Sequence, residues 1–425
     1  MSEQQGSKSG LERPSRRNFL GVGSAGIATA TLASLAVNAQ QRTENAEPSD
    51  SVQPVRGDQG ARLMGPSNPA REAQSTDRLR PPSTDHGTMP NLKWSFADSH
   101  NKLKEGGWAR QTTVREMSIA KELACVNMRL KAGAVRELHW HRPAEWAFMI
   151  KGRARITAID QEGRAFQDDV GEGDLWNFPT GIPHSIQGLE GEGCEFLLVF
   201  DDGSFNENET FLLTDWLAHI PKEVLAKNFG VPESAFARIP QDQLYIFQAE
   251  VPGPLAADRV VGAGPVPVSY SHRMMAQEPI RTKGGTVRIT DSTVFPAAST
   301  IAAGLVEVEP GGMRELHWHP TSDELQYYLA GESRMTVFAS DSTAGTFDYQ
   351  AGDVGYVPRS MPHYIENTGR TKLRFLELWK TDRFSDVSLA QWLAFTPYAL
   401  VRAHLNIDKS VLAKVSTRKT PVVGA

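Results

Sequence analysis

Short apolar or alternating runs recur along the chain from about residue 90 onward. Residues 122–130, 146–159 and 194–200 form such runs, and Gly, Pro and Asp residues separate them. Runs of this length bounded by turn residues are typical of β-strands. An amphipathic segment with helical spacing follows each of two such sets of runs, at 214–229 and at 389–404. The pattern predicts an all-β chain of two barrels or sandwiches in tandem, each with a short C-terminal helical extension.

The second set of strands repeats the first. The six letters RELHWH stand at 136–141 and again at 314–319, an offset of 178 residues (314 − 136). After one inserted residue the offset becomes 179, and 39 residues separate a glutamate from a later histidine in each copy (184 − 145 and 363 − 324). A repeat of this length indicates two copies of one domain. The four matched pairs are His139 with His317, His141 with His319, Glu145 with Glu324, and His184 with His363.

These matched residues carry the chemistry of a metal site. Residues two apart on a strand point to the same face, so His139 and His141 present two imidazoles side by side. Glu145 comes after a short turn, and His184 comes from a later strand. Three imidazole nitrogens and one carboxylate, with no thiolate, suit manganese or iron and leave coordination positions open. Because the same spacing occurs twice, we predict two metal sites rather than histidines that only pack.

Charge and cysteine content exclude other classes. The net charge is −5 and the sequence pI is about 6.2, and no basic stripe interleaved with aromatic residues is present, so a nucleic-acid partner is not expected. The two cysteines, Cys125 and Cys194, lie inside predicted strands. We predict two buried thiols rather than a disulfide or a thiolate zinc site.

The N-terminal region is predicted to be a targeting segment followed by a linker. Residues 15–20, SRRNFL, precede an uncharged, small-residue stretch at 21–39 that ends in a small-residue cleavage site, and this segment resembles a twin-arginine export signal. The stretch is too weakly apolar for a permanent membrane anchor. We therefore expect residues 1–39 to be a signal peptide, residues 40–89 to be a polar Pro-rich linker, and the mature protein to be periplasmic or secreted.

The repeated motifs resemble those of the cupin superfamily. The first cupin motif fits 133–152 and, with one extra residue, 311–331, and the second fits 173–184 and 352–367. Gly188 and Ser360 depart from the family's usual Asn and Gly, and we expect local turn changes there. The resemblance implies two cupin barrels of the double-stranded β-helix or jelly-roll type. We place them at 90–260 and 261–425.

Among two-domain cupins, the segments RELHWH…EWAFMI and DDGSFNENETFLLTDWLAHIP resemble bacterial oxalate decarboxylases. The resemblance implies oxalate as substrate, two Mn²⁺ per chain, dioxygen as co-catalyst, and formate and CO₂ as products of a radical mechanism. It also implies a homo-oligomer, a trimer or a hexamer, because the paired helical extensions resemble those that interlock cupin trimers.

The family also suggests roles outside the ligand set. The first copy carries a longer loop, NENE at 206–209, where the family has a lid over the N-terminal metal, and the lid's proton-transferring glutamate matches Glu207. The flanking residues are usually serines, but here they are Asn206 and Glu209. In the second copy Glu377 stands where the first has Leu198, and we take it as a second catalytic candidate.

Two arginines are the predicted substrate ligands. Arg136 and Arg314 would bind a dicarboxylate through their guanidinium forks. Strand parity alone puts Glu137, not Arg136, on the face of His139, so this assignment requires a bulge or a strand that begins after the arginine. The alternatives are an oxalate oxidase or other two-domain cupin dioxygenase with the same ligands, and a non-catalytic metal-binding or storage protein.

Overall fold

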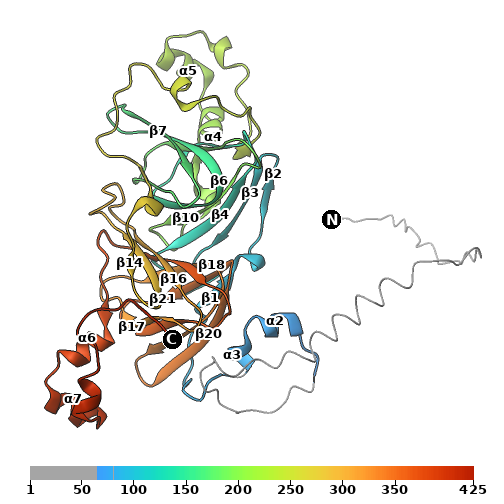
Figure 1. The fold of residues 1–425 in the computed structure, drawn as a ribbon. Helices are drawn as coiled ribbons and strands as arrows, with labels where there is room; N and C mark the ends of the chain where they lie inside the picture. Colours follow the sequence, from blue (N-terminus) through green and yellow to red (C-terminus); the bar gives the residue numbers. More distant parts are fainter. Residues whose placement is uncertain (1–64, 80) are drawn as a thin grey trace, which may run out of the picture. The chain divides into compact units, whose positions relative to one another are not determined.

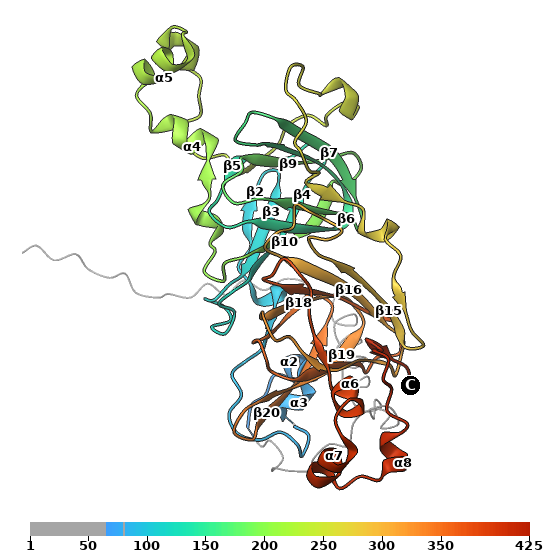
Figure 2. The same cartoon turned by 90° about the vertical axis from the view of Figure 1, so that its left-hand side faces the viewer.

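The computed structural model describes residues 65–79 and 81–425. The predicted signal peptide and the linker as far as residue 64 lie outside these residues. Two sets of antiparallel strands form two barrels (Figures 1 and 2), as the strand pattern predicted. The first consists of β2 (Lys102–Lys104), β3 (Gly107–Thr112), β4 (Ala124–Leu130), β5 (Val135–Trp140), β6 (Glu145–Ile159), β7 (Ala165–Gly171), β8 (Leu175–Phe178), β9 (His184–Gly188), β10 (Cys194–Phe200), β11 (Phe211–Leu212) and β12 (Ile246–Phe247).

The second barrel is built from two separate antiparallel sheets. One has the order β1-β21-β18-β23-β16-β15-β14 and the other β20-β19-β22-β17-β24, with β25 beside β17. In the first barrel the 15-residue strand β6 runs through both sheets and joins them. The strands of the second barrel are β14 (Ile280–Arg281), β15 (Gly285–Thr290), β16 (Ala302–Val308), β17 (Met313–Trp318), β18 (Glu324–Ala330), β19 (Glu332–Ala339), β20 (Thr343–Gln350), β21 (Asp353–Val357), β22 (His363–Asn367), β23 (Leu373–Trp379), β24 (Val387–Ser388) and β25 (Val422–Val423).

The two barrels exchange short strands. β1 (Lys93–Ser95) precedes the first barrel in the sequence but pairs with β21 of the second. In return, β13 (Ser271–His272) pairs with β8 of the first barrel. The end of the predicted linker also contacts the second barrel, because Arg334 donates a 2.7 Å hydrogen bond to Asp77 in α3 (Thr76–Leu79). The strands β1 and β13 therefore pair outside the domains to which the predicted boundaries, 90–260 and 261–425, assign them.

Each helical extension is broken in two. The sequence predicted one helical segment per copy, but the first contains α4 (Leu213–Ala218) and α5 (Lys222–Phe229), and the second contains α6 (Leu389–Ala394) and α7 (Tyr398–Leu405), followed by α8 (Lys409–Leu412). The break falls at Pro221 and at Pro397, which act as N-caps of α5 and α7, because proline lacks the N–H that would continue the preceding helix. Within the described part of the chain, no helix has the length and apolar character needed to cross a membrane.

The two departures from the cupin motifs have different outcomes. Ser360 adopts a left-handed backbone with φ +64°, close to the +72° of Gly181 at the matching position, so the turn is kept and the expected local change there is wrong. A Cβ on Gly188 would lie 2.3 Å from the carbonyl oxygen of Lys131, so glycine lets these segments approach closely. In the second copy the side chain of Asn367 instead donates to two backbone carbonyls.

Candidate metal centres

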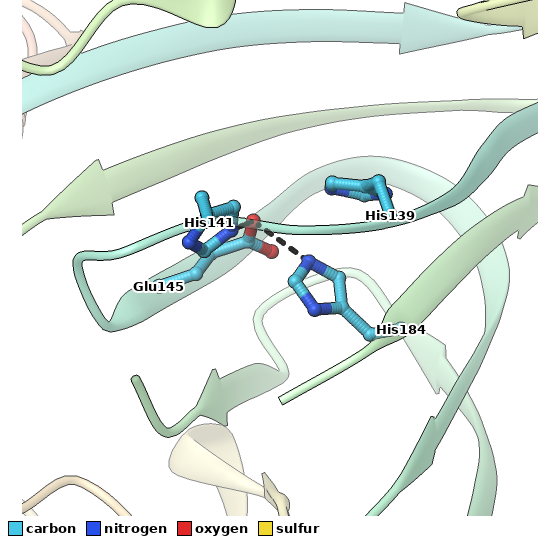
Figure 3. A group of neighbouring side chains, drawn as sticks. All are labelled: His139, His141, Glu145 and His184. Carbon is cyan, nitrogen blue, oxygen red and sulfur yellow. Dashed lines mark hydrogen bonds and ion pairs between the residues drawn. The ribbon is translucent and has the colours of Figure 1, made fainter. Parts of the chain in front are cut away.

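The four predicted ligands of the first copy lie together in the barrel interior. His139 is on β5, His141 follows its end, Glu145 begins β6 and His184 begins β9. Their ligand atoms all lie within 4.8 Å of one another, and all four side chains are buried. Figure 3 shows the imidazoles and the carboxylate turned toward a common centre. The predicted grouping is confirmed.

Backbone carbonyls orient the three imidazoles. The Nδ1 atoms of His139, His141 and His184 lie 2.6, 2.7 and 2.7 Å from the carbonyl oxygens of Glu137, Pro143 and Ile182. An Nδ1–H that donates to a carbonyl leaves Nε2 unprotonated and free to bind a metal. All three rings therefore offer the same kind of ligand atom to the centre.

The protonation states also fit a metal. Burial and the nearby Arg136 guanidinium hold the pKa of His139 well below its usual range, so the ring is neutral at pH 7. Burial alone would raise the pKa of Glu145, but His184 and His141 lower it, so the carboxylate is ionised. Nε2 of His184 is buried and makes no hydrogen bond, although the Glu145 carboxylate lies 3.4 Å away. A divalent cation would satisfy this unpaired nitrogen.

The second copy builds the same centre. Its ligand set, His317, His319, Glu324 and His363, is also buried and within 4.8 Å, and each Nδ1 contacts a backbone carbonyl. The difference is in what holds the carboxylate. Trp176 donates its indole N–H to Glu145 at 3.0 Å, whereas in the second site Gln326 donates to Glu324 at 2.8 Å. Both sets can hold a divalent metal through three nitrogens and one carboxylate.

A bulge turns each predicted substrate arginine inward. In the pairing of β5 with β9, Arg136 faces Ile186 and His139 faces His184, so three steps on one strand match two on the other. The same shift occurs between Arg314 and His317. An extra residue of this kind is a β-bulge, which reverses the facing of the side chains beyond it. Of the two expected alternatives, a bulge or a strand that begins after the arginine, the structure has the bulge, and both arginines are buried.

Arg136 forms an ion pair with Glu207, the glutamate of the predicted lid. Its Nη2 lies 2.9 Å from Oε2 of Glu207, and Tyr245 donates its hydroxyl to the same oxygen at 3.0 Å. Nη1 donates to the Tyr245 carbonyl, but Nε of Arg136 is buried without a partner. The site therefore retains one unused guanidinium donor beside a buried carboxylate that belongs to a loop.

Tyr245, which holds Glu207, is not among the residues that the sequence predicted for the site. Its backbone has φ +61°, which is unusual for a bulky residue, and its N–H donates to the Glu137 carboxylate at 2.8 Å. The same carboxylate accepts bonds from Leu244 and Thr214. Nonglycine residues in this conformation persist where the surrounding structure fixes them, often at functional sites. No motif marks position 245, and Pro421 takes the corresponding place in the second copy, since its carbonyl accepts from Arg314.

The predicted lid loop is a short turn that brings the buried Glu207 beside Arg136. Residues 207–209 form a 3₁₀ turn whose N-cap is Asn206, and the Asn206 side chain accepts from the backbone N–H of Asn208. The Asn206 amide also donates to Glu209 at 3.0 Å. The two residues that depart from the family's serines thus bond to each other across the turn.

The second arginine is enclosed differently. Nε of Arg314 donates to Glu377 at 3.1 Å, Nη2 to Asp386 at 2.8 Å, and Nη1 to the Pro421 carbonyl. Lys419 forms a further ion pair with Asp386. The structure therefore brings Arg314 and Glu377 beside the second cluster, as predicted, but pairs them with each other. Every nitrogen of the Arg314 guanidinium already has a partner, unlike Arg136.

Comparison with known proteins agrees with this architecture. The cupin family model matches residues 95–235 and 274–412, one match in each barrel. The oxalate decarboxylase OxdC of Bacillus subtilis is 59% identical over 375 residues, which covers 88% of this chain and 97% of that protein. A probable oxalate decarboxylase of Arthroderma benhamiae is 40% identical and covers 86% and 91%.

The solved structures give the same result. A structure of the Bacillus subtilis oxalate decarboxylase, studied for its Mn(II) centres, superposes with a TM-score of 0.85 at 58% identity. The alignment covers 88% of this chain and 99% of that one.

Proposed function

We propose that this chain, which belongs to the oxalate decarboxylase family of two-domain cupins, converts oxalate to formate and carbon dioxide. The observation that carries the proposal is the Arg136–Glu207 pair beside the first metal cluster. In this pair, a guanidinium group suited to binding a carboxylate and a carboxylate suited to proton transfer lie 2.9 Å apart inside a buried site. A storage or binding cupin would need neither group.

We assign Mn²⁺ to both His₃Glu sets, because the donors fit it and the similar Bacillus protein has Mn(II) centres. Bound manganese supplies, with dioxygen as co-catalyst, a one-electron oxidation of oxalate. Arg136 binds one carboxylate of the substrate and offsets its charge in the buried site. Glu207 takes the proton of the other carboxyl group. After the C–C bond breaks and CO₂ leaves, Glu207 returns this proton to the remaining carbon, and the electron removed at the start returns with it, which gives formate. The products are formate and CO₂, and dioxygen is not consumed.

We place turnover in the first site. Arg136 retains an unpaired donor, and its partner Glu207 lies in a short 3₁₀ turn and not in a strand of the barrel. Arg314 instead lies between the buried carboxylates of Glu377 and Asp386, so a substrate carboxylate would have to displace one of them. Glu377 remains the candidate proton donor of the second site, and Glu207 is the preferred candidate for the reaction.

The product distribution tests this function. With oxalate, dioxygen and manganese-loaded protein, we expect formate and CO₂ in equal amounts, with hydrogen peroxide as a minor product. An oxalate oxidase would produce mainly hydrogen peroxide and CO₂. A storage or binding cupin would consume no oxalate at all, so each alternative has its own result in one end-point assay.

The helical extensions support a homo-oligomer, which we propose to be a trimer or a hexamer. They carry large apolar side chains that are more than half exposed, namely Trp216, Phe229, Trp392 and Phe395. In Figure 2, α4 and α5 and also α6 to α8 extend away from the barrels. A monomer rarely exposes such patches. Light scattering should give three or six chains per particle, and Phe395→Glu should shift the distribution toward smaller species. A monomeric parent protein would exclude the assembly.

We also propose export by the twin-arginine route into the periplasm or medium. The support is the order of elements at 15–39, namely a twin arginine, a small-residue stretch and a cleavage site. This route carries folded proteins, so the metal can be inserted before export. N-terminal sequencing of the mature protein should find Gln40 as the first residue.

A further inference from the structure

A cavity of about 270 Å³ opens beside the lid of the first site. Its wall includes Glu207 and Asn208 of the lid, together with Tyr245, which holds Glu207. Lys102 and Gln111 belong to the same wall, from β2 and β3. The cavity therefore adjoins the residues that close the first site, and it is large enough for a small dicarboxylate.

Lys102 is the cation in this wall that has donors to spare. Its Nζ lies 2.8 Å from Oδ1 of Asn208 and 3.6 Å from the centre of the Tyr245 ring, and no carboxylate pairs with it among the described residues. Arg110, also in the wall, is engaged by Asn127 and by the Phe96 carbonyl. An ammonium group has three hydrogen-bond donors, so Lys102 can donate to a further ligand.

The second barrel lacks this cation. Lys102 pairs with Ala109 across the β2–β3 hairpin, and the matching pair in the second barrel is Ile280 with Val287. An isoleucine that is 52% exposed thus occupies the position of Lys102. The amine occurs only in the barrel that has the lid.

We propose that Lys102 forms an entrance site for oxalate outside the lid, where its ammonium group exchanges Asn208 for a substrate carboxylate. The inference rests on the proposed function. A carboxylate is a stronger acceptor for an ammonium group than a neutral side-chain amide. An arriving oxalate therefore takes the amine from Asn208, and the lid loses one of its contacts with the barrel. Three others remain on Glu207: its N–H donates to Oε1 of Gln111 at 3.2 Å, and its carboxylate accepts from Arg136 and Tyr245.

This exchange links arrival of the substrate to opening of the lid. While the cavity is empty, Lys102 holds the loop at Asn208, and Gln111, Arg136 and Tyr245 hold it at Glu207. When an anion is bound at Lys102, the contact at Asn208 is lost, so the population of the open form rises when substrate is present. After oxalate passes to Arg136, the amine can return to Asn208 and restore the closed lid.

Four variants of the manganese-loaded full chain test the site. Lys102→Met removes both the entrance charge and the lid anchor, whereas Asn208→Ala removes the anchor and keeps the charge. Lys102→Arg keeps a cation, and Lys104→Met removes an exposed charge two residues along the same strand. For each variant, KM and kcat for oxalate, the ionic-strength dependence of kcat/KM, the formate-to-peroxide ratio and the melting temperature are measured.

We expect Lys102→Met to raise KM by about three- to tenfold and to flatten the salt dependence, since one cation at a cleft mouth contributes part of the steering by charge. Asn208→Ala should leave KM near the parent value and shift the products toward peroxide. Lys102→Arg should stay within about twofold of the parent KM because it keeps the charge, and Lys104→Met should match the parent.

Two results would overturn the entrance site. One is an unchanged KM in Lys102→Met, and the other is an equal rise in KM in Asn208→Ala, which would mean that the lysine acts only through the lid. If Lys102→Met has a lowered melting temperature, its KM is compared with that of Lys102→Arg, which keeps the cation. Failure of the proposed function has a separate signature, because the parent protein would then produce no formate whatever the KM values are.

Discussion

Replacing Glu207 with glutamine should reduce formate production by about two to four orders of magnitude, the range for loss of a general acid or base. The amide oxygen of the new side chain can still accept the hydrogen bonds that Arg136 and Tyr245 now give to Oε2 of Glu207, so the lid keeps its closed contacts. The amide cannot return a proton to carbon. Electrons from oxalate then pass to dioxygen, and residual products should shift toward CO₂ and hydrogen peroxide.

The control lies in the same loop. Glu209→Gln keeps the oxygen that accepts from Asn206 and removes a carboxylate that is largely exposed. We expect parent-like formate production from it, and unchanged manganese content in both variants. If Glu207→Gln produces formate at the parent rate, or if only the Glu209 change impairs it, the proton donor is another group. Glu377 would then be the next candidate.

The metal ligands could be predicted because the chain contains the same pattern twice. A single His-x-His pair on a strand does not reveal its partners, but the matched spacing to Glu145 and His184 identified both sets. The bulge at Arg136 could also be predicted, since plain alternation conflicts with the family's use of that residue. The ligand sets followed from a local rule applied to both copies, whereas the bulge followed only when that rule was combined with the family resemblance.

The contacts that the sequence did not predict are long-range. Tyr245 reaches Glu207 because the Glu137 carboxylate fixes a left-handed backbone more than 100 residues along the chain. Neither that conformation nor the partner leaves a periodic signal. The ion pair between Arg314 and Asp386 is also long-range. Asp386 lies on a loop before a two-residue strand, so no periodic pattern identifies it as the partner of Arg314. By contrast, Pro221 and Pro397 were visible signals for the breaks in the helical extensions.

The exchanged strands show a further limit. β1 has three residues and β13 has two, which is too short for a pattern of alternation to identify a partner. Their pairing depends on which sheet edge lies nearby once both barrels have formed. Sequence position therefore assigned them to the adjacent barrel, and only the three-dimensional structure shows the crossing.

Replacing His139 with alanine should remove one metal per chain and abolish turnover. The parent protein, matured through its own export route, should contain about two manganese ions per chain, one for each His₃Glu set. Loss of a group that merely orients a ligand costs 10–100-fold, so loss of a ligand should lower activity by about 100-fold or more. Outside the cluster the His139 ring hydrogen-bonds to the backbone carbonyl of Glu137, and the Glu137 carboxylate keeps its bonds to Tyr245 and Thr214. The effect should therefore arise from the metal and not from the lid.

His317→Ala is the matched control, because it removes the equivalent ligand from the second site. It should also lose about one manganese ion per chain, but the fraction that folds should still produce formate, since turnover is assigned to the first site. Its stability must be measured beside its activity, because a buried ligand cluster without its metal also weakens the second barrel. Full activity in His139→Ala protein that has lost the metal would contradict the assignment of turnover to the first site. Zinc or copper as the sole metal of the parent would contradict the manganese assignment, whatever the activity of the two variants.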